Sequence, residues 1–223
     1  MNEVTLFVSL EKCDKSELIN LLENSYFEMN ADQRQAVFGS HIIDEINNRV
    51  IDQSGADDIV SDVNNFYKDS TAGVYYAPFN INSKNYMDIP EETSEWCNQV
   101  GIYLDEASQL TKQNFHTESV HCFKLLFDLF DKLADDDIVF ADELGSWMIG
   151  GDKEQAITCY ITSASTILPE NKFAEHIAAL LKIDSYESYS NQVYKKSLSI
   201  CTKEQMIALQ LEASIQKIKI KVP

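Results

Sequence analysis

Turn-forming residues are scarce in this sequence, which has 7 glycines and 4 prolines among its 223 residues. A sandwich or barrel of many strands needs frequent turns, so this scarcity argues against such folds and favours long helices. Basic residues are also few, with 18 against 36 acidic ones and a formal net charge of −18. A field of this sign repels the phosphate backbone, so we expect no direct contact with nucleic acid.

Closely spaced cysteines are missing as well. The 5 cysteines are odd in number and no CxxC pair occurs, which argues against both a disulfide framework and a zinc knuckle. No apolar run has membrane-spanning length, and the opening MNEVTLFVSLEKCDK has a glutamate where a signal peptide carries basic residues. We therefore expect a protein of the reducing cytoplasm that has no membrane contact.

Apolar residues recur at helical spacing through most of the chain, most clearly after Thr93. The first stripe there consists of Trp96, Val100, Leu104, Ala107 and Leu110. The second stripe, after a very short turn, consists of Val120, Phe123, Leu126, Phe127, Phe130 and Leu133. Two such helices joined by a short turn predict an αα-hairpin of the kind that stacks in solenoids.

Helix starts are marked by Asp, Asn or Thr followed three residues later by Glu or Gln, which is the spacing of a capping box. This spacing occurs at 14–17, 30–33, 152–155 and 202–205. We expect an antiparallel helical hairpin over residues 14–48, and an all-α chain with about nine or ten helices and little sheet. The alternating apolar residues of 3–10 and 217–223 fit either a strand or a helix.

Residues 70–90 break the helical pattern, because they carry several aromatics and two of the four prolines. A connection of this length is either functional or a boundary. The chain is thus expected to comprise an N-terminal helical hairpin region over 1–70, an aromatic-containing connection over 71–90 and a helical-repeat domain over 91–223, unless all of it packs as one domain. We expect the aromatics to anchor the connection to the core rather than to contact a ligand.

The stretch DKLADDDIVFADELGSW, residues 131–147, has the highest density of acidic side chains. It does not fit a calcium loop, because a loop starting at Asp135 would have Phe140 where an EF-hand has Gly and Ser146 where it has Glu. One interpretation is an interhelical joint whose kernel, 138–140, is buried. The other is a docking edge for a basic partner. The candidate docking residues are Asp135, Asp136, Asp137, Asp142 and Glu143.

No residues have the spacing of a catalytic or cofactor site. The chain has neither a GxSxG nucleophile elbow nor a GxxxxGK[ST] phosphate loop. His116, His121 and Cys122 are the best metal ligands by type, but side chains five residues apart on a helix point about 140° apart. Cys122 fits better as a small core residue. We therefore predict no catalytic residues, no metal and no cofactor, and a protein that is not an enzyme.

The segment from SEWCNQVGIYLDEASQL through ESVHCFKLLFDLFDKLADDD to ELGSW resembles tetratricopeptide-type helical hairpins. It is similar in particular to the helical region that follows the zinc finger in prokaryotic SWIM-domain proteins, and SELINLLENSYFEMNADQRQAVF resembles the short hairpin that precedes that region. The zinc finger itself is absent, because no CxC followed by CxH occurs, and the tetratricopeptide signature is incomplete. The resemblance implies an irregular α-α superhelix that serves protein–protein contact.

These observations favour a non-enzymatic interaction module or adaptor. Residues 85–145 hold 14 acidic and 3 basic residues, whereas residues 146–223 hold 8 and 9. We therefore expect another protein as the partner, with a basic or amphipathic segment that lies on the concave face of the superhelix. The alternative is an acidic inhibitor, such as a nucleic-acid mimic, an immunity protein or an antitoxin, that blocks a basic enzyme. A hydrolase with an unrecognised site ranks third.

Overall fold

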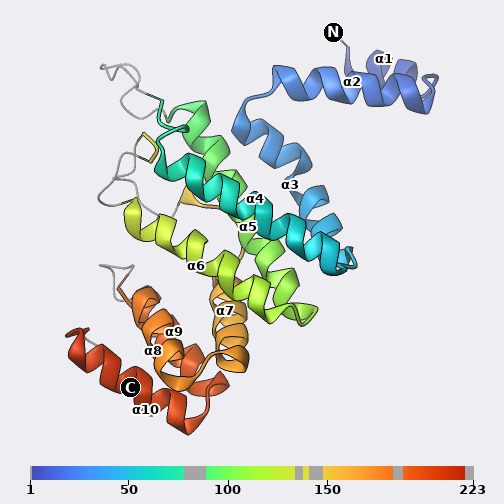
Figure 1. Ribbon diagram of the computed structural model, residues 1–223. Helices are drawn as coiled ribbons and strands as arrows, with labels where there is room; N and C mark the ends of the chain where they lie inside the picture. The colour runs from blue at the N-terminus through green and yellow to red at the C-terminus, as the bar shows by residue number, and fades with distance from the viewer. Residues whose placement is uncertain (1, 78–88, 134–137, 141–147, 183–187, 219–223) are drawn as a thin grey trace. The chain divides into compact units, whose positions relative to one another are not determined.

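The computed structural model describes residues 2–77, 89–133, 138–140, 148–182 and 188–218, and these residues form helices and turns without a strand (Figure 1). The all-α fold expected from the sequence is confirmed, and its superhelical arrangement stays a prediction. The helices are α1 Glu3–Leu10, α2 Lys15–Glu28, α3 Ala31–Asn48, α4 Gln53–Thr71, α5 Glu91–Lys112, α6 His116–Lys132, α7 Lys153–Ile167, α8 Glu170–Leu180, α9 Ser188–Ile200 and α10 Lys203–Ile215.

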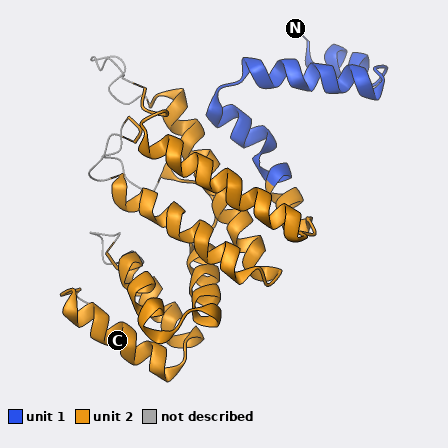
Figure 2. Ribbon diagram, viewed as in Figure 1, with its two compact units in different colours: residues 1–42 blue, residues 43–223 orange. Residues whose placement is uncertain are grey.

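The chain divides into two compact units, residues 1–42 and residues 43–223 (Figure 2). We call them unit 1 and unit 2. The division falls within α3, whose first residues belong to unit 1. The partition into 1–70, 71–90 and 91–223 that the sequence suggested stays a prediction, although α4 ends at Thr71 and α5 begins at Glu91.

The helix starts that the sequence predicted are confirmed. Asp14 and Glu17 form a complete capping box at α2, and Thr202 and Gln205 form another at α10. At α3, the side chains of residues 30 and 33 each accept a hydrogen bond from the backbone N–H of the other, at 2.9 and 3.0 Å. Asp152 accepts the backbone N–H of Gln155 at the start of α7. These bonds satisfy donors that the first turn of a helix leaves open.

In unit 1, residues 3–10, for which the sequence left both a strand and a helix open, form α1, whose first turn is capped by the Asn2 side chain. The antiparallel hairpin expected over 14–48 stays a prediction, because this segment spans both units. Within unit 1, α2 and the first residues of α3 meet at Met29, and we call this junction the elbow (Figure 2). The elbow is held by Tyr26, whose ring lies 5.9 Å from that of Phe38 and whose carbonyl accepts a hydrogen bond from Arg34 Nε at 3.0 Å.

Unit 2 is built on the α5–α6 hairpin. All residues of the two predicted stripes are buried, and the helix pair contacts α4 on one side and α7 on the other. The turn between α5 and α6 can be short because Asn114 adopts the left-handed conformation (φ 68°). This conformation lets the Phe115 N–H donate a hydrogen bond to the Leu110 carbonyl at 2.8 Å. This is a Schellman-type end, for which asparagine is the usual substitute for glycine.

The connection between α6 and α7 passes very close to α5. A Cβ atom added to Gly101 would lie 2.9 Å from the carbonyl carbon of Gly150, and Gly151 has a φ of +81°. Ile138 and Val139 are buried here, as the sequence predicted for the kernel of the joint, while Phe140 is half-buried. The glycines thus allow a backbone-to-backbone contact that a side chain would block.

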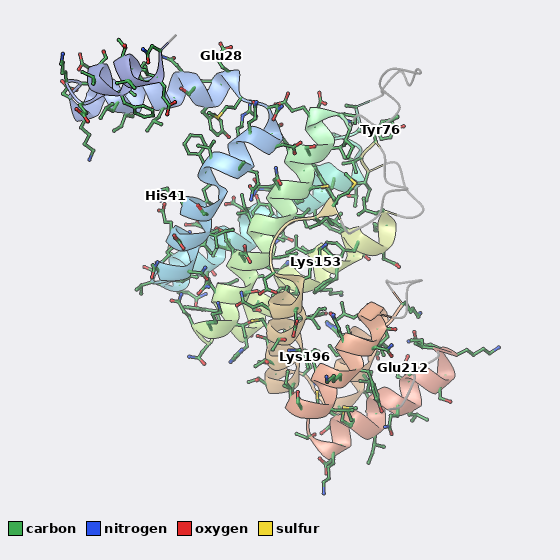
Figure 3. All side chains as sticks on the ribbon, turned by 180° about the vertical axis from the view of Figure 1, so that it is seen from behind. Glu28, His41, Tyr76, Lys153, Lys196 and Glu212 are labelled. Carbon is green, nitrogen blue, oxygen red and sulfur yellow. The ribbon has the colours of Figure 1, made fainter. Side chains whose placement is uncertain are left out.

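The C-terminal helices extend unit 2 from α7. α7 contacts α8 and α9, and α10 packs against α8. Lys196 on α9, which is labelled in Figure 3, forms an ion pair of 2.7 Å with Glu154 on α7. In the connection after α4, Tyr75 lies 5.3 Å from the core residue Phe66, ring to ring, so this aromatic anchors the loop as expected.

Candidate functional site

The five docking residues predicted from the sequence belong to the connection between α6 and α7. Asp135, Asp136, Asp137, Asp142 and Glu143 lie outside the described residues. Their role as a docking edge therefore stays a prediction, and the search for a site turns to the described parts of the chain. Three arrangements there have the residue types or the shape of a functional site.

The metal candidates do not converge. His116 Nδ1 lies 3.0 Å from Ser163 Oγ on α7, whereas His121 Nε2 lies 3.0 Å from Asn64 Oδ1 on α4. Cys122 is fully buried, and burial raises the pKa of its thiol to about 12. Among the described residues, no group of three or more His, Cys, Asp or Glu side chains is arranged to hold a metal ion.

The contact between His116 and Ser163 has the residue types of a nucleophile and its base, and it was not predicted from the sequence. Ser163 is fully buried, and its hydroxyl also lies 2.8 Å from that of Thr111 and 3.4 Å from that of Ser119. A nucleophile must reach its substrate, which this hydroxyl cannot do. The cluster instead satisfies polar groups where α5, α6 and α7 meet.

A pocket of about 330 Å³ lies between α6, α7 and α8. Phe127 and Tyr160 line it, and both are buried. Its other lining residues are Lys124, Asp128, Asp131, Glu175, His176, Ala179, Leu180 and Lys182. Charges of both signs surround an aromatic floor, so the pocket does not select an anion or a cation by charge.

The polar centre of this pocket is a contact between Tyr160 and His176, whose OH and Nδ1 lie 2.9 Å apart. Burial raises the pKa of Tyr160 and, together with the charge of Lys124, lowers the pKa of His176. Both shifts favour the neutral forms of the two side chains. The pair is thus a neutral hydrogen bond between α7 and α8.

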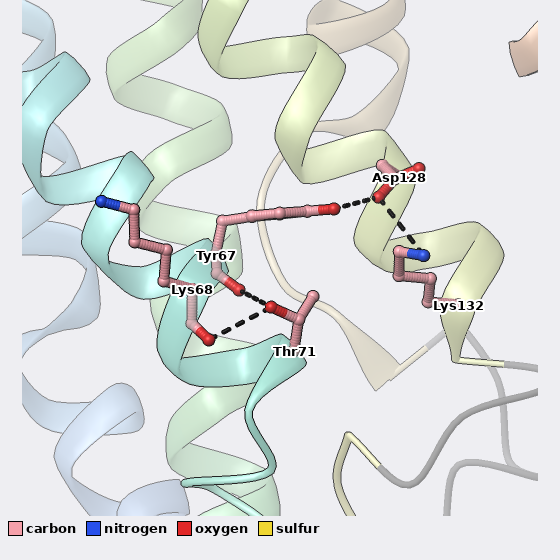
Figure 4. Close-up of polar contacts among 5 residues, drawn as sticks. All are labelled: Tyr67, Lys68, Thr71, Asp128 and Lys132. Atoms are coloured by element: carbon pink, nitrogen blue, oxygen red, sulfur yellow. Dashed lines mark hydrogen bonds and ion pairs between the residues drawn. The ribbon is translucent and has the colours of Figure 1, made fainter.

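Asp128, at the edge of the same pocket, is held by two neighbours (Figure 4). Tyr67 of α4 donates its OH to Asp128 Oδ2 at 2.6 Å, and Lys132 Nζ lies 3.8 Å from the same oxygen. Burial and this carboxylate raise the pKa of Tyr67 to about 12. The Asp128 carboxylate thus links α4 to α6, and this structural role accounts for the residue without a substrate.

The third arrangement is a groove in unit 1, at the elbow between α2 and α3. It has a volume of about 680 Å³. Its lining residues, which define what we call the elbow groove, are Leu21, Asn24, Ser25, Glu28, Met29, Gln33, Ala36 and Val37. Apolar side chains from both helices form its walls, and Glu28 is its single ionisable lining residue.

The first two helices of unit 1 have no core of their own. α1 and α2 contain no buried residue, although both carry large apolar side chains. Phe27 is 76% exposed, Phe7 57% and Leu22 53%. The other exposed large apolar residues of unit 1 are Val4, Val8, Ile19, Leu21, Tyr26, Val37 and Ile42. Large apolar side chains are thus exposed on α1, α2 and α3, and exposed apolar surface of this kind is typical of interaction sites.

Comparison of the chain with protein-family models, curated proteins and solved structures finds no match. The resemblance to tetratricopeptide and SWIM-associated helical regions therefore stays a prediction. The described helices include none that combines the length and the apolar character needed to cross a membrane. The arguments for function therefore come from the surfaces described above.

Proposed function

We propose that this chain is a non-enzymatic protein-interaction module, and that its unit 1 binds an amphipathic helix of another protein. The observation that carries the proposal is that α1 and α2 bury no residue and leave several large apolar side chains exposed. Helices of 8 and 14 residues are marginal when isolated in water. A helix laid into the elbow groove would supply the missing contacts.

The charge of unit 1 favours a basic partner. Residues 1–42 contain 7 acidic and 3 basic residues. Of the basic ones, Arg34 is stacked over the Tyr26 ring at 4.8 Å, so it is engaged within the elbow. Glu28 lines the groove itself. An amphipathic helix with lysine or arginine beside its apolar face would match both the apolar walls and this charge.

A pull-down with matched variants tests the proposal. Leu21→Lys combined with Val37→Lys puts two positive charges on opposite walls of the groove, whereas Asn20→Lys changes an exposed polar residue of α2 that does not line it. We expect mass spectrometry to identify a protein that the wild type and Asn20→Lys retain and the double variant loses. Binding should also weaken with rising salt. A partner retained equally by the double variant would refute the groove as the site.

The charge distribution also supports a second candidate, an acidic inhibitor of a basic enzyme. The 14 acidic and 3 basic residues of 85–145 contrast with the 8 and 9 of 146–223, so one part of the chain provides most of the negative field. If the protein that is pulled down is a basic enzyme whose activity falls on binding, this candidate applies. A partner without enzymatic activity favours the adaptor.

A further inference from the structure

The outer face of α10 carries a second unpartnered apolar surface, within unit 2. Ile207, Leu211 and Ile215 follow one another at intervals of four residues, so they lie on one side of the helix. Their exposed fractions are 66%, 62% and 65%. We call these three residues the α10 stripe. A helix ordinarily turns its apolar stripe towards the core and leaves polar residues on its solvent-exposed face.

The opposite face of α10 is firmly packed. Leu209 and Ala213 are buried against unit 2, where α10 lies on α8 (Figure 1). Gln205 accepts the hydroxyl of Ser165 on α7 at 2.7 Å and donates to its carbonyl at 2.9 Å. Gln210 donates to the hydroxyl of Tyr194 on α9 at 2.9 Å. The stripe is thus displayed on a helix that three others hold in place, so little order remains to be gained on binding.

The stripe has a symmetric sequence, Ile-x3-Leu-x3-Ile, with Leu211 at its centre. If two copies of α10 pack antiparallel about a two-fold axis at Leu211, Ile207 of each copy meets Ile215 of the other. Glu204 lies one turn before the stripe and Lys217 just after it, so antiparallel packing brings opposite charges together at both ends. Parallel packing would bring like charges together. The surface is therefore self-complementary, as an isologous interface must be.

The area of the stripe fits a pair of identical surfaces. Its three side chains expose roughly 350 Å² per copy, whereas a standard interface buries about 800 Å² per partner, of which about 60% is apolar. The stripe alone supplies most of that apolar share. We propose that α10 is a self-association surface, and that its occupant is the α10 helix of a second copy of this chain, packed antiparallel about Leu211.

Light scattering on the full chain tests whether the stripe mediates association. We expect the wild type to shift with concentration from the 25.3 kDa chain mass towards twice that value. Leu211→Lys should remain a monomer, because a two-fold axis at this position would place two positive charges together. Val50→Lys, at a residue that is 89% exposed outside the stripe, should behave like the wild type. A wild type that stays monomeric, or a Leu211→Lys variant that still dimerises, would overturn the proposal.

Disulfide trapping tests the antiparallel geometry and separates this surface from unit 1. In a parent with Cys13→Ser and Cys201→Ser, which removes the two cysteines that are not buried, Leu211→Cys should cross-link to itself under oxidised glutathione. Ile207→Cys alone should not, but it should cross-link when mixed with Ile215→Cys. Self-linking of Ile207→Cys would indicate parallel packing, and no linking at any position would indicate association elsewhere. Either result would contradict the proposal, and neither bears on binding at the elbow groove.

Discussion

α2 of unit 1 and α6 of unit 2 are both amphipathic helices with leucine- and aromatic-rich stripes, but they end in opposite environments. α6 buries eight of its 17 residues, because the stripes of α5 and α7 lie against it. α2 is 14 residues long and buries none. The comparison teaches that helical spacing of apolar residues predicts a helix and the face that it can bury, but not which surface will cover that face.

The two units therefore also differ in how much free energy of unfolding they gain from burial. Burying a large apolar side chain contributes about 1.5–3 kcal/mol, and unit 2 gains this at every position of its stripes. Unit 1 has instead the capping box of α2, a bond pair of the kind that contributes about 1 kcal/mol, and the ring contacts at its elbow. We therefore expect the two units to respond differently to the same substitutions, and unit 1 to gain protection only when a partner binds.

The largest difference is expected for the pair Phe123→Ala and Phe27→Ala. Phe123 is fully buried and stacks 5.9 Å from the Phe127 ring, so its loss should lower the free energy of unfolding by about 3–5 kcal/mol. Phe27 is exposed, and its loss should change that free energy by less than about 0.5 kcal/mol. Urea unfolding followed by circular dichroism measures both.

The same two variants can also refute the contrast between an exposed α2 and a buried α6. If Phe27→Ala destabilised the isolated chain as much as Phe123→Ala does, α2 would have a buried environment in solution. The case for an unpartnered unit 1 would then fail. An unchanged midpoint for Phe27→Ala, together with unchanged helix content, would support it.

Alanine in place of glycine should have opposite effects in the two units. At Gly101, the added Cβ would meet the Gly150 backbone at 2.9 Å, and we expect a loss of about 1–3 kcal/mol, as for other overpacked sites. At Gly39 of α3, the added Cβ would meet only the flexible end of the Gln35 side chain. Removing a helix-interior glycine there should stabilise unit 1 by about 0.5–1 kcal/mol.

The informative result is that the two substitutions should change stability in opposite directions. Thermal unfolding of Gly101→Ala should shift to lower temperature, whereas amide exchange in α3 should slow in Gly39→Ala. A Gly101→Ala variant as stable as the wild type would mean that α5 and the segment at Gly150 are not in close contact. Faster exchange in Gly39→Ala would mean that Gly39 is packed against something other than Gln35.

The local features of this fold could be predicted from the sequence because their causes are local. Capping depends on residues three positions apart, as at Thr202 and Gln205, and the stripe from Trp96 to Leu110 depends on helical period alone. The segment 3–10 was ambiguous since eight residues of apolar character fit either period. The cap from Asn2, which favours a helix there, is a single weak signal.

The features that escaped prediction depend on contacts between distant segments. Gly101 meets Gly150 only once the chain has folded, and Tyr67 finds Asp128 on a helix 61 residues away. The elbow groove escaped because capping boxes at residues 14 and 30 predict two helices but not the angle between them. The acidic residues 135–137 and 142–143 were the most conspicuous signal of all, and they lie outside the described residues.

The smallest expected effect is a pH dependence confined to unit 2. Burial and the charges of Lys124 and Lys172 lower the pKa of His176 from its ordinary 6.5, although Glu175 opposes them. The unfolded chain therefore binds this proton more readily than the folded chain does. The stability that neutral His176 contributes is complete above pH 6.5 and is lost as the pH falls through the lowered pKa.

His176→Gln isolates this contribution from the many carboxylates, because it removes the titrating group and keeps a polar side chain. Between pH 7 and pH 5, the free energy of unfolding of the wild type should fall more steeply than that of the variant. The difference between the two should not exceed what the titration of a single histidine can contribute. Urea unfolding at matched pH values measures the two slopes. Parallel slopes would show that His176 is as hydrated in the folded chain as in the unfolded one. The pocket between α6, α7 and α8 would then be open to water at Tyr160, and the contrast between a sealed unit 2 and an exposed unit 1 would be weaker there.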